Sequence, residues 1–522
     1  MKKSVAIHPF LFALYPIIYL VAHNIGELLL IDRFSLTSVF LPMIVSLGFA
    51  SVSMLMLGLI LKNAKKAALI VTASLFLFFS YGHFYDMTSR LMRDSAFWIG
   101  RFVIGPHKIV FFAWCALFCI AAFFSIKTRR DLKMITSFLN ITAGCLIAIS
   151  MVNIGFHEFK RMEIWKGYAD KRDALEERAA IGSGIGYSPD IYYIILDGYT
   201  SSKKLEEIYG FDNSEFTDYL VEKGFFIAFE SMSNYAQTTH SLASSLNMEY
   251  INYVTDIVNS KYSAMGMLYL KLRNNKVIDF LKKRGYKFVH FATSYGLTEH
   301  NKFADIEFHF GKKNEFYYML VNTTMLCYFR EKFNMAGDKR RMVLDTFSTL
   351  SKMPAIEGPK FVFAHMIIPH PPYYFDEDGG MPPKILGAEG GKNAWAEKEA
   401  YVKQLIFLNK KIKAFLDKIE SGSSTPPVII LQGDHGTEAT FSHGQRSRAS
   451  TTDEMMEERM SIFNAYCLPQ GGKKALYSSI SPVNTFRVLF NYYFNADFEL
   501  LEERSYFSSY ERPFEFIAVN RE

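Results

Sequence analysis

Cysteine is scarce in this chain, and the positions of its few copies exclude two kinds of scaffold. Only five occur among 522 residues. Cys115, Cys119 and Cys145 lie in apolar runs, where cysteine behaves as a small hydrophobic residue. The other two, Cys327 and Cys467, can form one disulfide bond at most. A fold built on disulfides and a cysteine-based metal site are therefore excluded.

A strong excess of one charge is also missing. The formal net charge is +6, and the basic residues do not gather into a stripe of the kind that binds nucleic acid. Nucleic acid is therefore not expected as a partner. Long apolar runs are almost absent after about residue 155, where most of the charged residues lie. This asymmetry predicts a membrane region followed by a water-soluble domain.

What the first part of the chain does contain is a series of apolar segments, each close to the roughly 20 residues that a helix needs to cross a bilayer. There are five: Phe10–Ile31, Leu36–Leu61, Ala67–Tyr85, Ile109–Ile126 and Met134–Ile154. Lysine and arginine are frequent in the loops 62–66 and 127–133, which the positive-inside rule places in the cytoplasm. The sequence thus predicts a multi-pass protein of the cytoplasmic (inner) membrane with an extracytoplasmic (periplasmic) carboxyl domain.

The chain divides into three parts on this basis. Residues 1–155 form the transmembrane domain. Residues 156–189 contain the charged stretch Glu158–Glu177 with interspersed aromatic and apolar residues, which predicts an amphipathic helix along the membrane surface, and then a glycine-rich linker. Residues 190–522 form the water-soluble carboxyl domain.

The carboxyl domain alternates between strand-like and helix-like segments. One strand is predicted within 190–198, where it ends in an acid and a glycine, and further strands at 225–229, 287–291, 360–365, 428–431 and 462–467. Helices are predicted at 268–284, 396–419 and 483–493, with a further one starting near 238. Such alternation is typical of an α/β domain with a largely parallel sheet and helices on its faces.

Two of these strands end in acidic residues. Asp197 follows the first strand, and Asp434 and His435 follow the strand that begins at Val428. Ligands and catalytic groups collect at the carboxyl ends of parallel strands, and carboxylate with imidazole suits a divalent metal such as zinc. The alternative for Asp434 alone is a surface turn in which it caps the next segment.

A third group of candidates carries hydroxyl and imidazole groups. Thr238 and Thr239 stand at the predicted start of a helix, where free backbone N–H groups favour an anion. A hydroxyl near a metal can act as a nucleophile there, and an ordinary helix cap is the alternative. His365 fits a structural role at the end of a strand. His370, in a proline-rich loop, and His443 are candidates for a substrate or second-metal site.

In this order the motifs resemble the alkaline phosphatase superfamily in its sulfatase-like branch. The pattern is a strand followed by Asp197-Gly, then Thr238-x-x-Ser-x-x-Ser, then His370-Pro, then Asp434-His435-Gly. The membrane spans in front of it are similar to the layout of membrane-anchored phosphoethanolamine and phosphoglycerol transferases. The resemblance implies that Asp197, Thr238, Asp434 and His435 hold a divalent metal, Zn²⁺ or Mn²⁺. It also implies that Thr238 is the nucleophile, assisted by His370 as acid or base.

The sequence departs from its relatives at three points. No cysteine stands at the nucleophile position, which argues against sulfatases that use a formylglycine. The lipid A enzymes are rich in disulfides, and the lipoteichoic acid enzymes place Glu where Asp197 stands. The headgroup is therefore left open between phosphoethanolamine and phosphoglycerol.

The function that this resemblance implies is transfer of a substituted phosphate from a phospholipid donor to an envelope glycan or lipid, lipopolysaccharide included. A phospho-threonine would be the intermediate. Two alternatives stay open: a membrane-anchored phosphodiesterase or phosphatase that passes the group to water, and a non-catalytic envelope scaffold. The complete set of motif residues argues against the scaffold.

Overall fold

The structure is a computed structural model that describes residues 5–28, 36–92, 97–99, 102–175, 188–257, 261–293, 295–310, 315–329, 335–387, 393–441 and 451–520. The chain divides into two compact units. The first contains residues 1–160 and 312–335, and the second contains residues 161–311 and 336–522.

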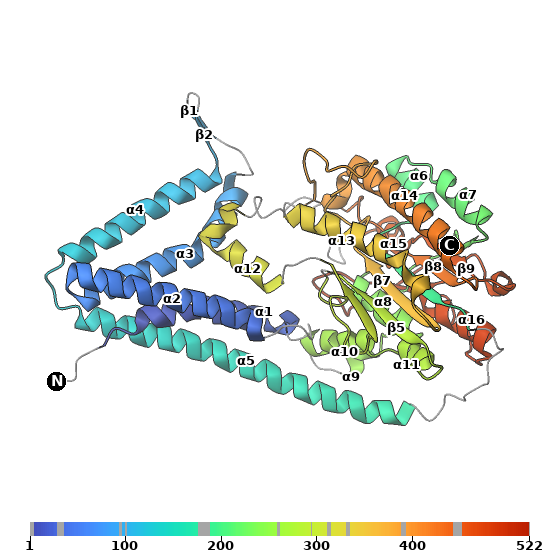
Figure 1. Cartoon of the computed structure of the whole chain (residues 1–522), viewed down its shortest axis with the longest axis horizontal. Helices are drawn as coiled ribbons and strands as arrows, with labels where there is room; N and C mark the ends of the chain where they lie inside the picture. Colours follow the sequence, from blue (N-terminus) through green and yellow to red (C-terminus); the bar gives the residue numbers. More distant parts are fainter. Residues whose placement is uncertain are drawn as a thin grey trace. The chain divides into compact units, whose positions relative to one another are not determined.

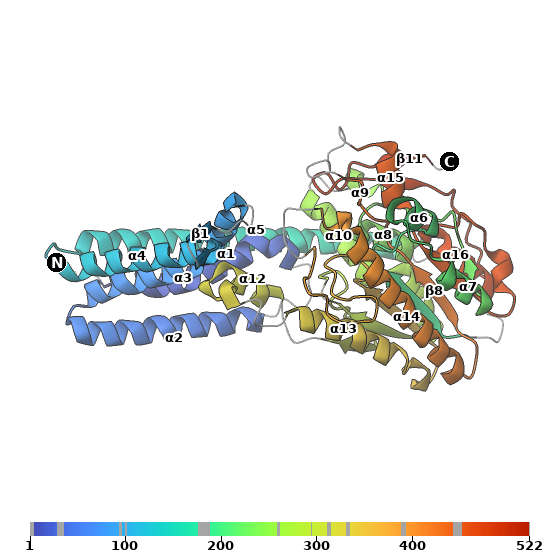
Figure 2. The ribbon, with the colours of Figure 1, turned by 90° about the horizontal axis from the view of Figure 1, so that it is seen from above.

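The first unit is a set of long apolar helices (Figure 2). They are α1 (His8–Leu28), α2 (Leu36–Leu61), α3 (Ala64–Met92), α4 (Pro106–Lys127) and α5 (Lys133–Leu175), and a short hairpin of β1 (Phe97–Ile99) and β2 (Phe102–Ile104) precedes α4. By length and composition, α2 to α5 are each able to cross a membrane. Helix α1 packs against α2 and α3 through Ala13, Ile17 and Leu20. The apolar helices predicted for the amino-terminal region are therefore present, and among the described residues four of them have the length and composition of membrane spans.

The end of this region differs from the prediction. Helix α5 continues without a break from Lys133 to Leu175, so the stretch expected as a separate helix on the membrane surface extends the last membrane helix instead. The charged residues in this stretch are mostly Glu, Lys and Arg, which favour helix. After Ile154 the helix contains no proline and no two adjacent glycines that would interrupt it.

A second departure concerns residues 312–335, which the sequence analysis included in the carboxyl domain. They cluster with the membrane helices instead. Helix α12 (Glu315–Thr323) places Phe316 in the same apolar cluster as Leu20 and Val71, and the following 3₁₀ turn (Met325–Phe329) places Cys327 beside Tyr81. The apolar run in this segment is too short to cross a bilayer, so the length criterion for membrane helices does not identify it.

Close approach of α12 to α3 depends on one glycine. A Cβ atom added to Gly82 in α3 would lie 1.8 Å from the carbonyl oxygen of Asn322 in α12. Since no side chain tolerates that distance, only glycine lets the two helix backbones meet here.

The second unit is built on a sheet of seven strands in the order β4-β9-β8-β3-β7-β5-β6 (Figure 1). The strands are β3 (Ile191–Leu196), β4 (Phe226–Ile227), β5 (Lys287–Ala292), β6 (Ile306–His309), β7 (Lys360–Met366), β8 (Val428–Gln432) and β9 (Asn464–Cys467). The five strands from β8 to β6 are parallel. At one edge, β9 pairs antiparallel with β8, and β4 pairs antiparallel with β9. Every strand predicted from the sequence is present, whereas β6 was not predicted.

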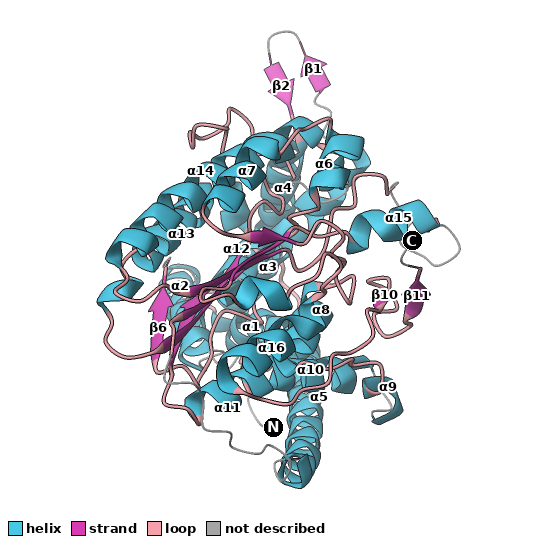
Figure 3. Cartoon of the chain, turned by 90° about the vertical axis from the view of Figure 1, so that its right-hand side faces the viewer, coloured by secondary structure: helices cyan, strands magenta, loops and turns pink. Residues whose placement is uncertain are grey.

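Helices cover both faces of this sheet, as predicted (Figure 3). Alternate residues of β3 divide between two cores: Tyr192 and Ile194 face one, and Tyr193 and Ile195 face the other. The first core is covered by α6 (Ser202–Tyr209), α7 (Ser214–Glu222), α13 (Met335–Leu350) and α14 (Lys398–Gly422), and the second by α8 (Thr238–Asn247), α10 (Lys261–Arg273), α11 (Lys276–Lys282) and α16 (Pro482–Phe494). Burial of β3 on both faces explains its unbroken apolar sequence.

Three further elements belong to this unit. They are α9 (Val254–Ile257), α15 (Asp453–Met460) and a hairpin of β10 (Ser505–Phe507) with β11 (Ile517–Val519). The predicted helix 268–284 is two helices, because Asn275 ends the first and caps the second by accepting a hydrogen bond from the N–H of Ile278. All five cysteines are free thiols, so the single disulfide that the sequence allowed is not formed.

Candidate metal centre and nucleophile

The two acidic motifs meet because their strands are neighbours. Strands β3 and β8 pair in parallel with Ile195 opposite Gln432, so the residues that follow them leave the sheet at the same edge. Asp197, Asp434 and His435 are all buried, and their ligand atoms lie within 4.8 Å of one another. His435 Nε2 is 3.5 Å from Asp197 Oδ1 and 3.3 Å from Asp434 Oδ2.

The proton of His435 can be assigned from its other nitrogen. Nδ1 lies 2.9 Å from the carbonyl oxygen of Gly436, and a carbonyl can only accept, so Nδ1 carries the proton. Burial and the nearby Arg459 guanidinium lower the pKa of His435, which keeps the ring neutral. Nε2 therefore directs a lone pair toward the two carboxylates.

The carboxylates are arranged to present one oxygen each to this nitrogen. Asp434 Oδ1 accepts a hydrogen bond from the N–H of Gly198 at 3.0 Å, and Asp197 Oδ2 lies 3.2 Å from His365 Nε2. The other two oxygens, Asp197 Oδ1 and Asp434 Oδ2, are buried without a hydrogen-bond partner in the described part of the chain. Two carboxylate oxygens and an imidazole lone pair thus converge with no proton between them. This set fits a divalent cation, which would satisfy all three.

Asp197 keeps its negative charge in this environment. Burial favours the neutral acid, but the nearby His370 imidazole and the contact with His365 outweigh it and hold the pKa of Asp197 well below its usual range. His365 is fixed in turn by Thr298, whose hydroxyl lies 2.9 Å from His365 Nδ1. His365 thus orients Asp197, in agreement with the structural role expected from the sequence.

The two candidate threonines point to different partners. Thr238 is the first residue of α8, and its Oγ1 lies 3.2 Å from His435 Nε2. Thr239 Oγ1 instead lies 3.5 Å from the hydroxyl of Tyr295. Only Thr238 of the pair faces the carboxylate–imidazole group, in the first turn of a helix, whose N–H groups lack intrahelical partners.

The remaining predicted histidines fall in different places. The N–H of His370 donates to the carbonyl oxygen of Asp197 at 3.0 Å, and the His370 ring lies 6.3 Å from that of His435, between centroids. It also packs edge-on against Trp395. His443 lies outside the described residues.

A buried arginine holds the site together and was not predicted. The guanidinium of Arg459, in α15, donates from Nε to the carbonyl oxygen of Ala236 at 2.7 Å and from Nη1 to that of Gly436 at 3.0 Å. It thereby ties the segment before Thr238 to the segment after His435. No short motif identifies this residue, because the sequence of a charged helix does not tell a buried arginine from a solvent-exposed one.

Glycine at position 436 has a steric cause. A Cβ atom there would lie 2.1 Å from the carbonyl oxygen of Glu458, the residue before Arg459. The Asp-His-Gly motif therefore combines two candidate ligands with the residue that lets α15 approach them.

One family model and several solved structures are similar to this chain. The family model described as Sulfatase matches residues 189–478, which is more than half of the chain. No curated protein matches the chain in sequence.

Solved structures with a similar fold include membrane and periplasmic proteins. One is the integral membrane protein lipooligosaccharide phosphoethanolamine transferase A (EptA) from Neisseria meningitidis, with 13% identity over 93% of this chain and 95% of that one and a TM-score of 0.38. Another is the periplasmic domain of EcEptC from Escherichia coli in complex with Zn, with 12% identity, 65% and 96% coverage and a TM-score of 0.42. A third is the periplasmic domain of phosphoethanolamine transferase EptC from Campylobacter jejuni, with 13% identity, 60% and 92% coverage and a TM-score of 0.39. On the match of residues 189–478, the chain belongs to the sulfatase family, as the order of its motifs predicted.

Proposed function

We propose that this protein is a metal-dependent membrane transferase that moves a substituted phosphate from a phospholipid to an envelope lipid or glycan. The observation that carries the proposal is the convergence of Thr238 Oγ1 and the unpaired carboxylate oxygens of Asp197 and Asp434 on His435 Nε2. A nucleophilic hydroxyl beside a metal-binding set is what phosphoryl transfer through a covalent intermediate requires.

In this proposal Asp197, Asp434, His435 and the Thr238 hydroxyl hold one divalent ion, Zn²⁺ or Mn²⁺. When bound, the ion lowers the proton affinity of the hydroxyl and neutralises charge on the phosphate. The protein contributes position: the sheet edge sets both carboxylates, His365 fixes Asp197, and Arg459 holds the two loops.

The reaction then consists of two displacements at phosphorus. Thr238 Oγ1 forms a bond to phosphorus while the bond to the diacylglycerol oxygen breaks, and that oxygen leaves with a proton. The first-turn N–H groups of α8 stabilise the charge on the phosphoryl oxygens. An acceptor hydroxyl next attacks phosphorus and gives its proton to His370. The bond between phosphorus and Thr238 Oγ1 breaks, and the proton passes to Oγ1, which restores the Thr238 hydroxyl.

The membrane unit supports a lipid substrate. Helices able to span a bilayer precede the catalytic unit on the same chain, and the basic loops 62–66 and 127–133 favour an extracytoplasmic catalytic unit. Donor and acceptor are then both envelope molecules, with phosphoethanolamine or phosphoglycerol as the transferred group.

The experiment that tests this function traps the intermediate. Full-length protein in detergent is incubated with Mn²⁺ or Zn²⁺ and phosphatidylethanolamine labelled in the headgroup, and peptides are mapped by mass spectrometry. A phosphoethanolamine adduct on Thr238 is expected, and labelled phosphatidylglycerol is the parallel donor. Absence of any adduct with either donor would contradict the proposed intermediate.

The acceptor decides between transfer and hydrolysis. A hydrolase would share the first displacement and release the free headgroup phosphate into water. Labelled product that partitions with lipid A or another envelope lipid supports transfer, whereas label recovered only as free phosphoethanolamine would identify a phosphodiesterase.

A further inference from the structure

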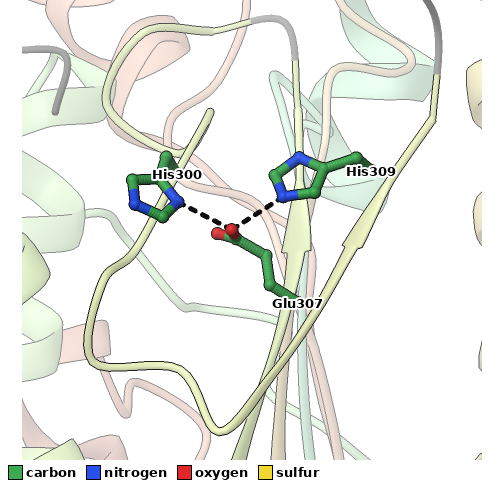
Figure 4. A group of neighbouring side chains, drawn as sticks. All are labelled: His300, Glu307 and His309. Carbon is green, nitrogen blue, oxygen red and sulfur yellow. Dashed lines mark hydrogen bonds and ion pairs between the residues drawn. The ribbon is translucent and has the colours of Figure 1, made fainter. Parts of the chain in front are cut away.

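A second group of imidazole and carboxylate side chains lies at the far edge of the sheet from β4, on strand β6. Glu307 and His309 are two residues apart in this strand, so both side chains project from the same face. His300, in the turn that precedes the strand, points toward them. Figure 4 shows the two rings on either side of the Glu307 carboxylate.

The two oxygens of Glu307 have different partners. Oε1 is anchored from the protein side, 2.7 Å from the N–H of Asn301 and 2.8 Å from Nδ1 of His290 in the adjacent strand β5. Oε2 lies 2.6 Å from His300 Nδ1 and 2.7 Å from His309 Nε2. One oxygen is therefore fixed in place, and the other is held between two imidazole nitrogens.

The different surroundings of the two Glu307 oxygens match those of a carboxylate that binds a metal. Carboxylates that bind a metal through one oxygen are commonly held by hydrogen bonds to the other. Here His290 and Asn301 supply those bonds. Hydrogen bonds from His290, His300 and Asn301 also hold the pKa of Glu307 below its usual range, although burial favours the neutral acid.

The solvent exposure of the side chains also differs between the two sides of the Glu307 carboxylate. The His290 side chain is 2% exposed, Glu307 11%, His300 20% and His309 31%. The orienting histidine is inside, and the two other imidazoles border solvent. An ion from solution can therefore reach Oε2 without any rearrangement of the core.

We propose that His300, Glu307 and His309 form a second divalent metal site of the two-histidine, one-carboxylate type, with Zn²⁺ as the best-matched ion. The ligand atoms are His300 Nδ1, Glu307 Oε2 and His309 Nε2, which all lie within 4.8 Å of one another. The site uses no residue of the Asp197, Asp434 and His435 centre.

The position of the site gives it a structural role for catalysis. His300 ends a segment, residues 295–300, that carries Tyr295 and Thr298. Tyr295 contacts Thr239, and Thr298 contacts His365, which orients Asp197. A metal bound at His300 fixes the outer end of this segment to strand β6, so the new site is a positioning site for the threonine helix and for His365.

The test counts bound ions. Full-length protein in detergent is stripped with a chelator, dialysed against Zn²⁺ alone, and analysed for zinc per chain by mass spectrometry. Relative to wild type, His300→Ala and His309→Ala are each expected to lose one equivalent. The double variant is also expected to lose only one, because both residues serve the same ion.

A matched control comes from the same turn. Lys302→Ala changes an exposed side chain between His300 and Glu307 and is expected to keep the full zinc content. Unchanged zinc in the double variant would show that the cluster is held by hydrogen bonds alone and would overturn the proposal.

A stability measurement guards against misfolding. In an Asp434→Ala background, which disables the first centre, Zn²⁺ is expected to raise the melting temperature, since a ligand that binds only the native state stabilises it. Adding His309→Ala should remove that rise, whereas adding Lys302→Ala should not. A rise that survives His309→Ala would place the ion elsewhere and contradict this site. Failure of the proposed transferase activity would leave both measurements intact.

Discussion

Two groups of carboxylate and imidazole lie on the same sheet, and they differ in how their oxygens are satisfied. At the edge between β3 and β8, Asp197 Oδ1 and Asp434 Oδ2 are buried and have no hydrogen-bond partner in the described chain. At strand β6, both oxygens of Glu307 accept hydrogen bonds, and two of its imidazole neighbours border solvent. The first group is incomplete without a cation, whereas the second is stable with or without one.

This difference separates the roles of the two groups. Buried acceptors without donors cost free energy, about 1–3 kcal/mol for each neutral group and more for charged groups, so the first group must gain from binding an ion. The second group must give up existing hydrogen bonds to bind one. We therefore expect the first centre to bind a metal more tightly than the second, and catalysis to depend on the first.

The largest expected effect is loss of the nucleophile. Thr238→Ala should lower turnover by about 10³-fold or more and abolish the covalent adduct, because its hydroxyl is the only one of the threonine pair that faces His435. Thr238→Ser should keep measurable activity, since a hydroxyl remains. Thr239→Ala is the matched control and should still be labelled. An adduct on Thr239 would shift the nucleophile by one residue.

Removal of a metal-binding carboxylate should come next. Asp434→Ala should reduce affinity for the catalytic ion by more than about 100-fold, because loss of a group that only orients a metal ligand already costs about 10–100-fold. Isothermal titration with Zn²⁺ or Mn²⁺ measures this directly, and circular dichroism checks the fold. Full metal content in Asp434→Ala would show that Asp434 does not bind the ion. The expected difference in metal affinity between the two groups would then have no support.

A smaller effect is expected from the residue that orients Asp197. His365→Gln should weaken metal binding by about 10–100-fold, since the ring holds Asp197 Oδ2 at 3.2 Å without facing the ion itself. The activity lost should return at high metal concentration. Loss that no metal concentration restores would assign His365 a direct catalytic role.

A third carboxylate, which is partly buried, sharpens the comparison, because lysine ammonium groups rather than imidazoles surround it. Glu249 lies 2.7 Å from Lys271 Nζ and 2.5 Å from Lys276 Nζ. Burial opposes its ionisation, but the two lysines prevail and lower the pKa of Glu249 to about 2. Since this is below the ordinary value of 4.5, the ion pairs stabilise the fold above pH 4.5, and this stability is lost as the pH falls toward 2.

The corresponding measurement is unfolding as a function of pH. Glu249→Gln should reduce the free energy of unfolding by up to about 3 kcal/mol at neutral pH and should flatten the acid limb between pH 4.5 and 2. Glu222→Gln, an exposed residue of α7, should change neither. An acid limb that persists in Glu249→Gln would show that other carboxylates dominate.

The sheet could be predicted from sequence because its inner strands are buried on both faces. The runs 191–196 and 428–431 are short, continuous and apolar, and these two properties identified them as buried strands. Strand β6 was missed because Ile-Glu-Phe-His covers only four residues at an edge and half of them are polar. The break at Asn275 was missed because apolar residues continue on both sides of it.

The candidate site divides in a similar way. Asp197, Asp434, His435 and Thr238 belong to short motifs at strand or helix ends, and the structure brings them together. Arg459 acts through backbone carbonyls that no sequence pattern identifies. Likewise, His300 and Glu307 come together through the turn between them and through the pairing of β6 with β5. The sequence did not predict this pairing, because it did not predict β6.

The excursion of residues 312–335 into the membrane unit also sets an order of events during biosynthesis. Strands β5 and β6 are made before this segment, and β7 is made after it, yet β7 lies between β3 and β5 in the sheet. The ribosome must therefore deliver α12 before the strand that completes the centre of the sheet exists. Strand β8, which precedes Asp434 and His435, is made later still, so the candidate metal centre cannot be complete until the chain has been synthesised well beyond this segment.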